Sequence, residues 1–303
     1  MSEQLVTCIH QSKRAGYALE KWEFLKDYKY SVIFTCNDFS SILKKAKEII
    51  PLENTYENDY LYTSFVKPVA YSMDGYYFLK FNLAYAAIHP LTQEEFLTKY
   101  PFLVVFHEKG ELIEFRFDVL KRVFLSDKKE PTIYSNLIAE MSDYFKEHFE
   151  CDLIPLNLDF MVNVCKRDEN VKLIAQSMKL PNGGNAQLDV GNNQEYILPF
   201  IGELRSLLND NQAELEKVPD FREALEQFMF EMEEMSDYPW IELLWENEIK
   251  TRSNRVKFVF NYMNKSYCLI QYYYSNVLIG MERMNYVIEY IVNHRNDDTT
   301  QNE

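Results

Sequence analysis

The chain has 303 residues, 47% of them hydrophobic and 15% aromatic, so it can build a substantial core and is not a disordered protein. Its formal net charge of −15 disfavours the basic surface of a general nucleic-acid coat. No apolar run is long enough to span a bilayer, and we expect no membrane association.

The cysteines and the first residues indicate a reducing compartment. The five cysteines are odd in number and scattered, which argues against a secreted disulfide framework. The N-terminal residues lack the basic-then-apolar pattern of a signal peptide. We therefore expect reduced thiols and a cytoplasmic protein.

The first half of the chain alternates helical and strand patterns. Residues 17–25 are typical of a short helix and residues 30–36 of a buried strand. Asp38 is suited to cap a helix over 39–50, which Pro51 would end. Thr92 and Glu95 form a capping box, which predicts a short helix over 92–99, and Thr132 is suited to cap a helix that runs to His148.

Turn residues between apolar runs predict antiparallel hairpins. Asp74-Gly75 and the glycines at 110, 183 and 184 supply the backbone freedom that tight turns require. The paired strands are 66–72 with 76–83, 102–106 with 112–117, and 171–180 with 186–190.

The end of the chain predicts one more hairpin and a helix. Strands 256–262 and 267–274 flank a turn in which Asn264 tolerates positive φ. After Ser275 the period becomes helical, and the apolar side of this helix should lie across the hairpin. It contains Met281, Met284, Ile288 and Ile291, and is widened by Tyr286.

These elements predict an α+β fold of antiparallel hairpins and packed helices. The polar segment Gly191-Asn-Asn-Gln194 is the best domain boundary. We expect an α+β domain over 1–190 and an acidic, helix-rich domain with the terminal hairpin and helix over 195–303. One continuous domain is the alternative.

Residues 201–250 carry most of the net charge. They contain fourteen Asp and Glu residues against four Lys and Arg, a net charge of −10. Apolar residues recur between them at helical spacing, including Leu204, Leu207, Leu208, Leu215, Phe221, Leu225, Phe228 and Met232. The pattern predicts two amphipathic helices with apolar inner sides and acidic outer faces.

We expect the outer faces to bind a basic protein, because attraction between opposite charges speeds encounter. The candidate partner-binding residues are Glu223, Glu226, Glu231, Glu233 and Glu234. A solvated face that only keeps the protein soluble is the alternative.

A short basic and aromatic strip follows the acidic block. Five bases from Lys250 to Lys265 occur with no acid between them and with tyrosines close by. Such a strip can follow a nucleic-acid strand through phosphate contacts and base stacking. The candidate residues are Arg252, Arg255, Lys257, Lys265 and Tyr262. The alternative is that these bases pair with the acidic helices.

Paired carboxylates favour a metal site as an alternative. Glu242 and Glu246 are four residues apart on a helix expected to start near Pro239, so they would share a face and could hold a divalent cation. Glu248-Ile-Lys250 and Glu114-Phe-Arg116 loosely fit the ending of metal-dependent nuclease motifs.

A zinc site is a further alternative. Cys8, His10, His148 and Cys151 could supply four ligands, although their spacing is not that of a zinc finger. No phosphate loop, dinucleotide fingerprint or nucleophile motif is present, and we expect no cofactor.

The sequence therefore favours a soluble, non-enzymatic interaction protein that acts through an acidic helical surface. Its Lys-, Asn-, Tyr- and Ile-rich composition indicates a microbial or phage origin. In that setting it would be an inhibitor, an immunity factor or a subunit of an antiviral defence complex. The alternative is a nucleic-acid-binding or metal-dependent nuclease subunit that uses the strip at 250–274, and whether the chain is an enzyme stays open.

Overall fold

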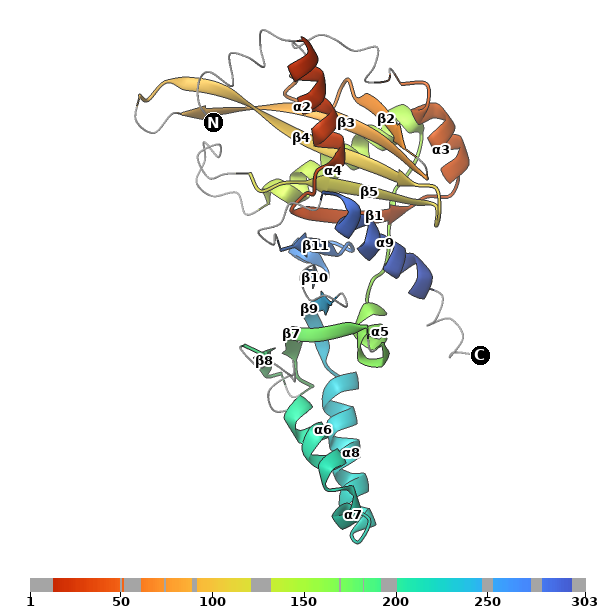
Figure 1. The fold of residues 1–303 in the computed structure, drawn as a ribbon, viewed down its shortest axis with the longest axis vertical. Helices are drawn as coiled ribbons and strands as arrows, with labels where there is room; N and C mark the ends of the chain where they lie inside the picture. Colours follow the sequence, from red (N-terminus) through yellow and green to blue (C-terminus); the bar gives the residue numbers. More distant parts are fainter. Residues whose placement is uncertain are drawn as a thin grey trace. The chain divides into compact units, whose positions relative to one another are not determined.

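The computed structural model shows an α+β protein whose paired strands are antiparallel (Figure 1). It describes residues 13–49, 51, 61–73, 75–88, 92–120, 132–168, 170–181, 183–191, 201–246, 253–273 and 280–295. None of the helices in these ranges is long and apolar enough to cross a membrane.

Two compact units make up the chain. The first unit contains Met1–Leu156, Met263–Tyr267 and Leu278–Val292, and the second contains Asn157–Tyr262, Cys268–Val277 and Asn293–Glu303. The division expected from the sequence, 1–190 and 195–303, concerns independently folding domains and stays a prediction.

The first unit is built on one antiparallel sheet. In spatial order its strands are β2 (Val69–Met73), β3 (Tyr76–Ile88), β4 (Glu95–His107), β5 (Leu112–Phe117), β1 (Tyr30–Thr35) and the short β6 (Ile154–Pro155). All six residues of β5 are buried, so both faces of the sheet are covered.

One face of this sheet is apolar and aromatic. The register places Tyr77 opposite Phe106 and Val104 opposite Phe115, so these side chains share a face. Helices α3 (Phe39–Ala46) and α4 (Ile133–Phe149) pack on it. The Phe145 ring of α4 lies 6.1 Å from that of Phe106 and 5.8 Å from that of Phe115, between ring centroids.

The opposite face carries buried charges. It contains Lys80, His107, Glu114 and Arg116, which alternate with the aromatic residues along the same strands. Helices α2 (Lys13–Leu25) and α9 (Glu282–His294) contribute the polar groups that pair with them. Buried charges require such partners, because removing an unpaired charge from water is costly.

The second unit has its own antiparallel strands. In spatial order they are β11 (Leu269–Tyr272), β10 (Asn254–Val259), β9 (Asp237–Trp245), β7 (Val171–Lys179) and β8 (Asn185–Asp189). Helix α5 (Met161–Arg167) packs near β7 and β9. Helices α6 (Ile201–Asp210), α7 (Gln212–Leu215) and α8 (Pro219–Glu234) complete the described part of this unit.

Most local predictions are confirmed. The predicted hairpins are present as β2–β3, β4–β5, β7–β8 and β10–β11. Asp38 caps α3 by accepting a hydrogen bond of 3.0 Å from the Ser41 amide, and Asn264 has a φ of 59°. Thr132 precedes α4 without making a side-chain cap bond, so that detail was wrong.

Two predicted helices are strands. Residues 95–99 begin β4 and pair with Ala84–Ile88 of β3, so the ladder overrides the capping-box pattern. The segment after Pro239 belongs to β9, which lies between β7 and β10. Both errors arise because a local helix signal is weaker than pairing with neighbouring strands, one for residues 95–99 and two for β9.

Helix α9 lies within the first unit. We expected it to lie across the hairpin 256–274, but its contacts are with the β2–β5 sheet and the segment after α2. Met281, Met284, Ile288 and Ile291 are buried as predicted, whereas Tyr286 is exposed. Arg283 of α9 is also buried and forms an ion pair of 2.8 Å with Asp27.

Gly110 in the β4–β5 turn provides a test of how α9 packs. Its φ is 99°, and an added Cβ would lie 2.7 Å from a methyl group of Val292 on α9. We expect Gly110→Ala to lower the free energy of unfolding by about 2–3 kcal/mol, through left-handed strain and overpacking. Gly75→Ala is the control, since Gly75 has a φ of 77° but no atom within 4 Å of the added Cβ. Equal losses in urea unfolding for both variants would contradict the packing contribution.

Candidate protein-interaction surface

The acidic hairpin, defined as residues 201–235, is the most unusual surface among the described residues. Pro219 occupies the first turn of α8, where its missing amide hydrogen has no helical acceptor. Arg205 of α6 forms an ion pair with Glu233 of α8, which joins the two helices. The residues contain ten acids and three bases, a net charge of −7.

The apolar stripe of α8 is largely uncovered. Phe221, Leu225, Phe228, Met232 and Met235 recur at four- and three-residue steps, so they lie along one side of the helix. Phe221, Phe228 and Met235 are 61%, 47% and 64% exposed, and the other two are half-buried. Among the described side chains of α6 to α8, Ile201 and Met229 are the buried apolar ones.

This exposure corrects the expected inner faces. Leu207, Phe221 and Phe228 were expected to point inward, and the structure leaves them exposed. Phe230 is also exposed, on the opposite side of α8 from Phe221. Large apolar residues gathered on one surface mark interaction sites more often than solubilising faces.

The candidate partner-binding glutamates occupy different environments. Glu223, Glu226 and Glu231 are exposed, with Glu226 accepting a bond of 2.7 Å from Arg222 and Glu231 one of 2.9 Å from Gln227. Glu233 is only 13% exposed because of its pairing with Arg205, which differs from the predicted outer position. The side chain of Glu234 lies outside the described residues.

The basic–aromatic strip is partly engaged within the second unit. Arg255 forms an ion pair with Glu242 of β9, and its guanidinium lies 5.0 Å from the Tyr273 ring centroid. The Lys257 ammonium lies 3.4 Å from the Trp240 ring centroid, a cation–π contact. Lys265 is exposed and Tyr262 is half-buried, whereas Arg252 lies outside the described residues.

The paired carboxylates of the metal hypothesis are bound to bases. Glu242 lies on strand β9 and pairs with Arg255, while Glu246 accepts a bond of 2.7 Å from Lys172. The predicted shared helical face is therefore wrong, because β9 is extended. Glu248 and Lys250 lie outside the described residues.

The residues of the zinc hypothesis are not brought together where they can be described. The His148 ring stacks on Tyr144 with centroids 4.0 Å apart, and Cys151 contacts Cys36. Cys8 and His10 lie outside the described residues. Within the ranges that the structure describes, no three His, Cys, Asp or Glu residues are grouped to hold a metal ion.

A buried charge cluster in the first unit was missed by the sequence analysis. Glu114 accepts hydrogen bonds of 2.8 Å from Arg116 Nε and 2.8 Å from His107 Nε2, and Arg116 donates one of 2.7 Å to Asn285 of α9. Burial alone raises the pKa of Glu114, but Arg116 and His107 outweigh it and hold the pKa below its usual range. The sequence does contain a signal for this cluster. Glu114 and Arg116 stand in the strand Leu112–Phe117, and all the other residues of that strand are apolar.

Glu114 and Arg116 thus pair with each other and do not form part of a nuclease motif. Each has a fully buried side chain, which leaves neither group open to a metal or a phosphate. A similar cluster joins Lys80 and Lys99 to Glu20 and Glu23 of α2. Both clusters connect helices to the sheet.

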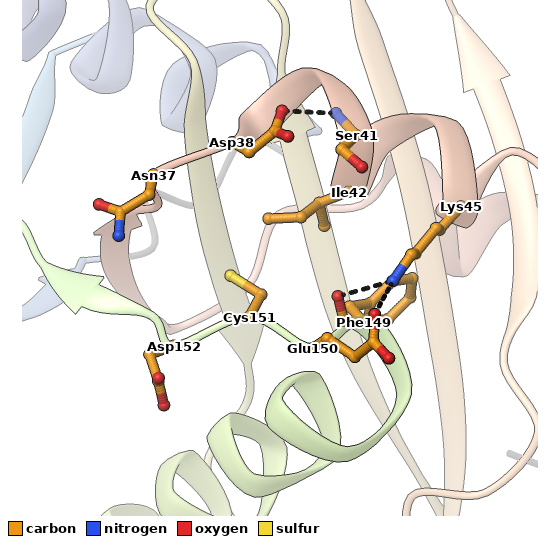
Figure 2. Close-up of a pocket in the computed structure, with 9 residues that line it drawn as sticks. All are labelled: Asn37, Asp38, Ser41, Ile42, Lys45, Phe149, Glu150, Cys151 and Asp152. Carbon is orange, nitrogen blue, oxygen red and sulfur yellow. Dashed lines mark hydrogen bonds and ion pairs between the residues drawn. The ribbon is translucent and has the colours of Figure 1, made fainter.

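A pocket of about 260 Å³ lies in the first unit beside α3 and the end of α4 (Figure 2). Asp38 and Ser41 line it on one side, and Glu150 and Cys151 on the other. Lys45 donates a bond of 2.8 Å to Glu150 and one of 3.2 Å to the Phe149 carbonyl. The lysine therefore has acceptors of its own and is not poised for a ligand anion.

Comparison with known proteins gives no family for the chain. No protein-family model matches it, and a search of curated proteins finds no similar sequence.

Proposed function

We propose that the protein is a non-enzymatic interaction factor of the cytoplasm, whose acidic hairpin binds a basic, amphipathic helix of a partner protein. The observation that supports this is the uncovered apolar stripe of α8, from Phe221 to Met235, on a hairpin whose net charge is −7. Removing apolar surface from water is favourable by about 25 cal/mol for each Å². A partner that covers the stripe would gain this free energy on binding.

The chemistry of the partner follows from the two halves of this surface. The apolar stripe repeats as in helices that lie in a groove or against another helix, so it suits the apolar side of a second helix. The exposed Glu231 lies beside this stripe and would face a Lys or Arg residue. The exposed Glu223 and Glu226 lie on the other side of α8 and would attract a basic partner over a longer range. The same net charge of −7 repels a phosphate backbone, which favours a protein over a nucleic acid.

A purely solubilising face is the weaker explanation. Carboxylates increase solubility, but exposed phenylalanines decrease it, and α8 carries both. Binding energy at interfaces is concentrated in a few large apolar and aromatic residues surrounded by polar ones. The acidic hairpin has that composition.

The test combines capture of the partner with matched variants. A photo-crosslinking amino acid at Ala224, which is exposed beside the apolar stripe, should capture a basic protein from the native host, whereas the same group at Leu97 on β4 should not. With the purified partner, Phe221→Ser with Phe228→Ser should weaken binding about 30-fold or more, because each removes an exposed apolar contact. Reversing Glu223, Glu226 and Glu231 to Lys should slow association about tenfold at low salt, and the difference should shrink at high salt.

Leu97→Ser with Val119→Ser is the matched control, because these first-unit residues are 65% and 48% exposed. This variant should bind like the wild type. Stopped-flow rates and calorimetric affinities separate the outcomes. Unchanged binding in both hairpin variants would mean that the acidic hairpin only keeps the protein soluble and does not bind the partner.

A further inference from the structure

Two cysteines distant in sequence meet beside the pocket of Figure 2. Cys36 follows β1, and Cys151 follows α4 just before β6. Strands β1 and β6 pair through Phe34 with Pro155 and Thr35 with Ile154, so the two cysteine-bearing segments run next to each other. The thiol of Cys36 is within hydrogen-bonding reach of the thiol of Cys151.

The pair is partly accessible. Cys36 is half-buried, while Cys151 is buried except where it lines the pocket. Figure 2 shows the Cys151 sulfur pointing toward the segment of Asn37 and Asp38, away from the helix that precedes it. An oxidant of the size of peroxide can therefore reach Cys151 from the pocket and Cys36 through its exposed part.

We infer that Cys36 and Cys151 form a redox pair that closes into an intramolecular disulfide when the protein meets hydrogen peroxide. The Cys36 thiolate attacks one peroxide oxygen, the O–O bond breaks, and sulfenic acid and water are formed. The Cys151 thiolate then attacks the sulfenic sulfur, and a second water leaves as the S–S bond forms. Two thiols are oxidised and one peroxide is reduced.

The environment makes this reaction slow at neutral pH. Burial, together with the neighbouring Cys151, raises the pKa of Cys36 to about 12, so little of it is thiolate. Below about pH 12, the rate of disulfide formation should therefore increase roughly tenfold for each unit by which the pH rises. Both thiols stay reduced in a reducing cell, and the disulfide forms under sustained oxidation.

The cross-link should stabilise the first unit. It joins positions more than about 100 residues apart, and closing so long a loop restricts the unfolded chain. It also fixes the end of β1 to the segment after α4, next to the pocket. We expect the Tm of the full chain to rise by roughly 5–10 °C on oxidation and to return with a reductant.

The experiment treats the full chain with hydrogen peroxide at pH 7 and pH 9 under native conditions and maps all five cysteines by mass spectrometry. A Cys36–Cys151 peptide that forms faster at pH 9 and disappears with reductant is the expected result. Cys268 is buried, with its pKa raised well above the usual value by burial, so Cys268→Ser should change nothing.

Cys36→Ser and Cys151→Ser should each abolish the cross-link and the rise in Tm. Cys36→Ser is the milder change, because that side chain is only half-buried. Accumulation of sulfinic acid at Cys36 without a cross-link, or pairing of either cysteine with a different one, would overturn the inference.

Discussion

Replacing Arg116 by Met should lower the free energy of unfolding by about 3–5 kcal/mol, because it leaves the Glu114 carboxylate buried without its main cation. The Glu114 carboxylate accepts a hydrogen bond of 2.8 Å from Arg116 Nε and lies 2.7 Å from a second guanidinium nitrogen, and both side chains are inaccessible to water. The same change removes the bond to Asn285, which connects β5 to α9.

A double-mutant cycle isolates the interaction free energy between Glu114 and Arg116. Glu114→Gln with Arg116→Met removes both charges, so the double variant should be more stable than Arg116→Met alone by about 1–3 kcal/mol. Urea unfolding of the wild type and the three variants gives the coupling. Arg222→Met on α8 is the surface control and should leave the urea midpoint unchanged, since that ion pair is exposed to solvent. Additive losses in the cycle would mean that Arg116 acts only by packing.

Replacing Glu20 by Gln should remove about 3 kcal/mol of stability at pH 7, and this difference should vanish in acid. Burial alone raises the pKa of Glu20, but Lys80 and Lys99 outweigh it and lower the pKa to about 2. A carboxyl whose pKa is lower in the folded state stabilises the fold above its unfolded pKa of 4.5. That stability is lost as the pH falls from about 4.5 toward 2.

The measurement is urea unfolding of both forms at pH 7, 4 and 3. The wild type should lose stability more steeply than Glu20→Gln over this range, so the two curves converge. Glu23 of α2 also faces Lys80 and Lys99, at 2.6 and 2.7 Å, and it remains in the variant. Glu147→Gln on the exposed side of α4 is the matched control and should follow the wild type at each pH. Parallel curves for wild type and Glu20→Gln would contradict the assigned role of Lys80 and Lys99.

Elements fixed by short-range signals were predictable from the sequence. The β4–β5 and β10–β11 hairpins depend on alternating apolar residues and a few turn positions, all within about 20 residues. The cap at Asp38 is likewise local, since its hydrogen bond reaches only to Ser41. For such elements the competing structures differ mainly in nearby residues, which a single sequence displays.

The tertiary structure decided what lies opposite each element. Residues 95–99 fit a helix start, but pairing with Ala84–Ile88 makes them extended. Lys80 and Arg116 stand in apolar strands, and only the arrival of α2 and α9 supplies their partners. The same holds for the acidic hairpin. The sequence determined its amphipathic pattern, while the fold determined that the apolar stripe of α8 stays uncovered, because burial depends on which distant elements come to pack there.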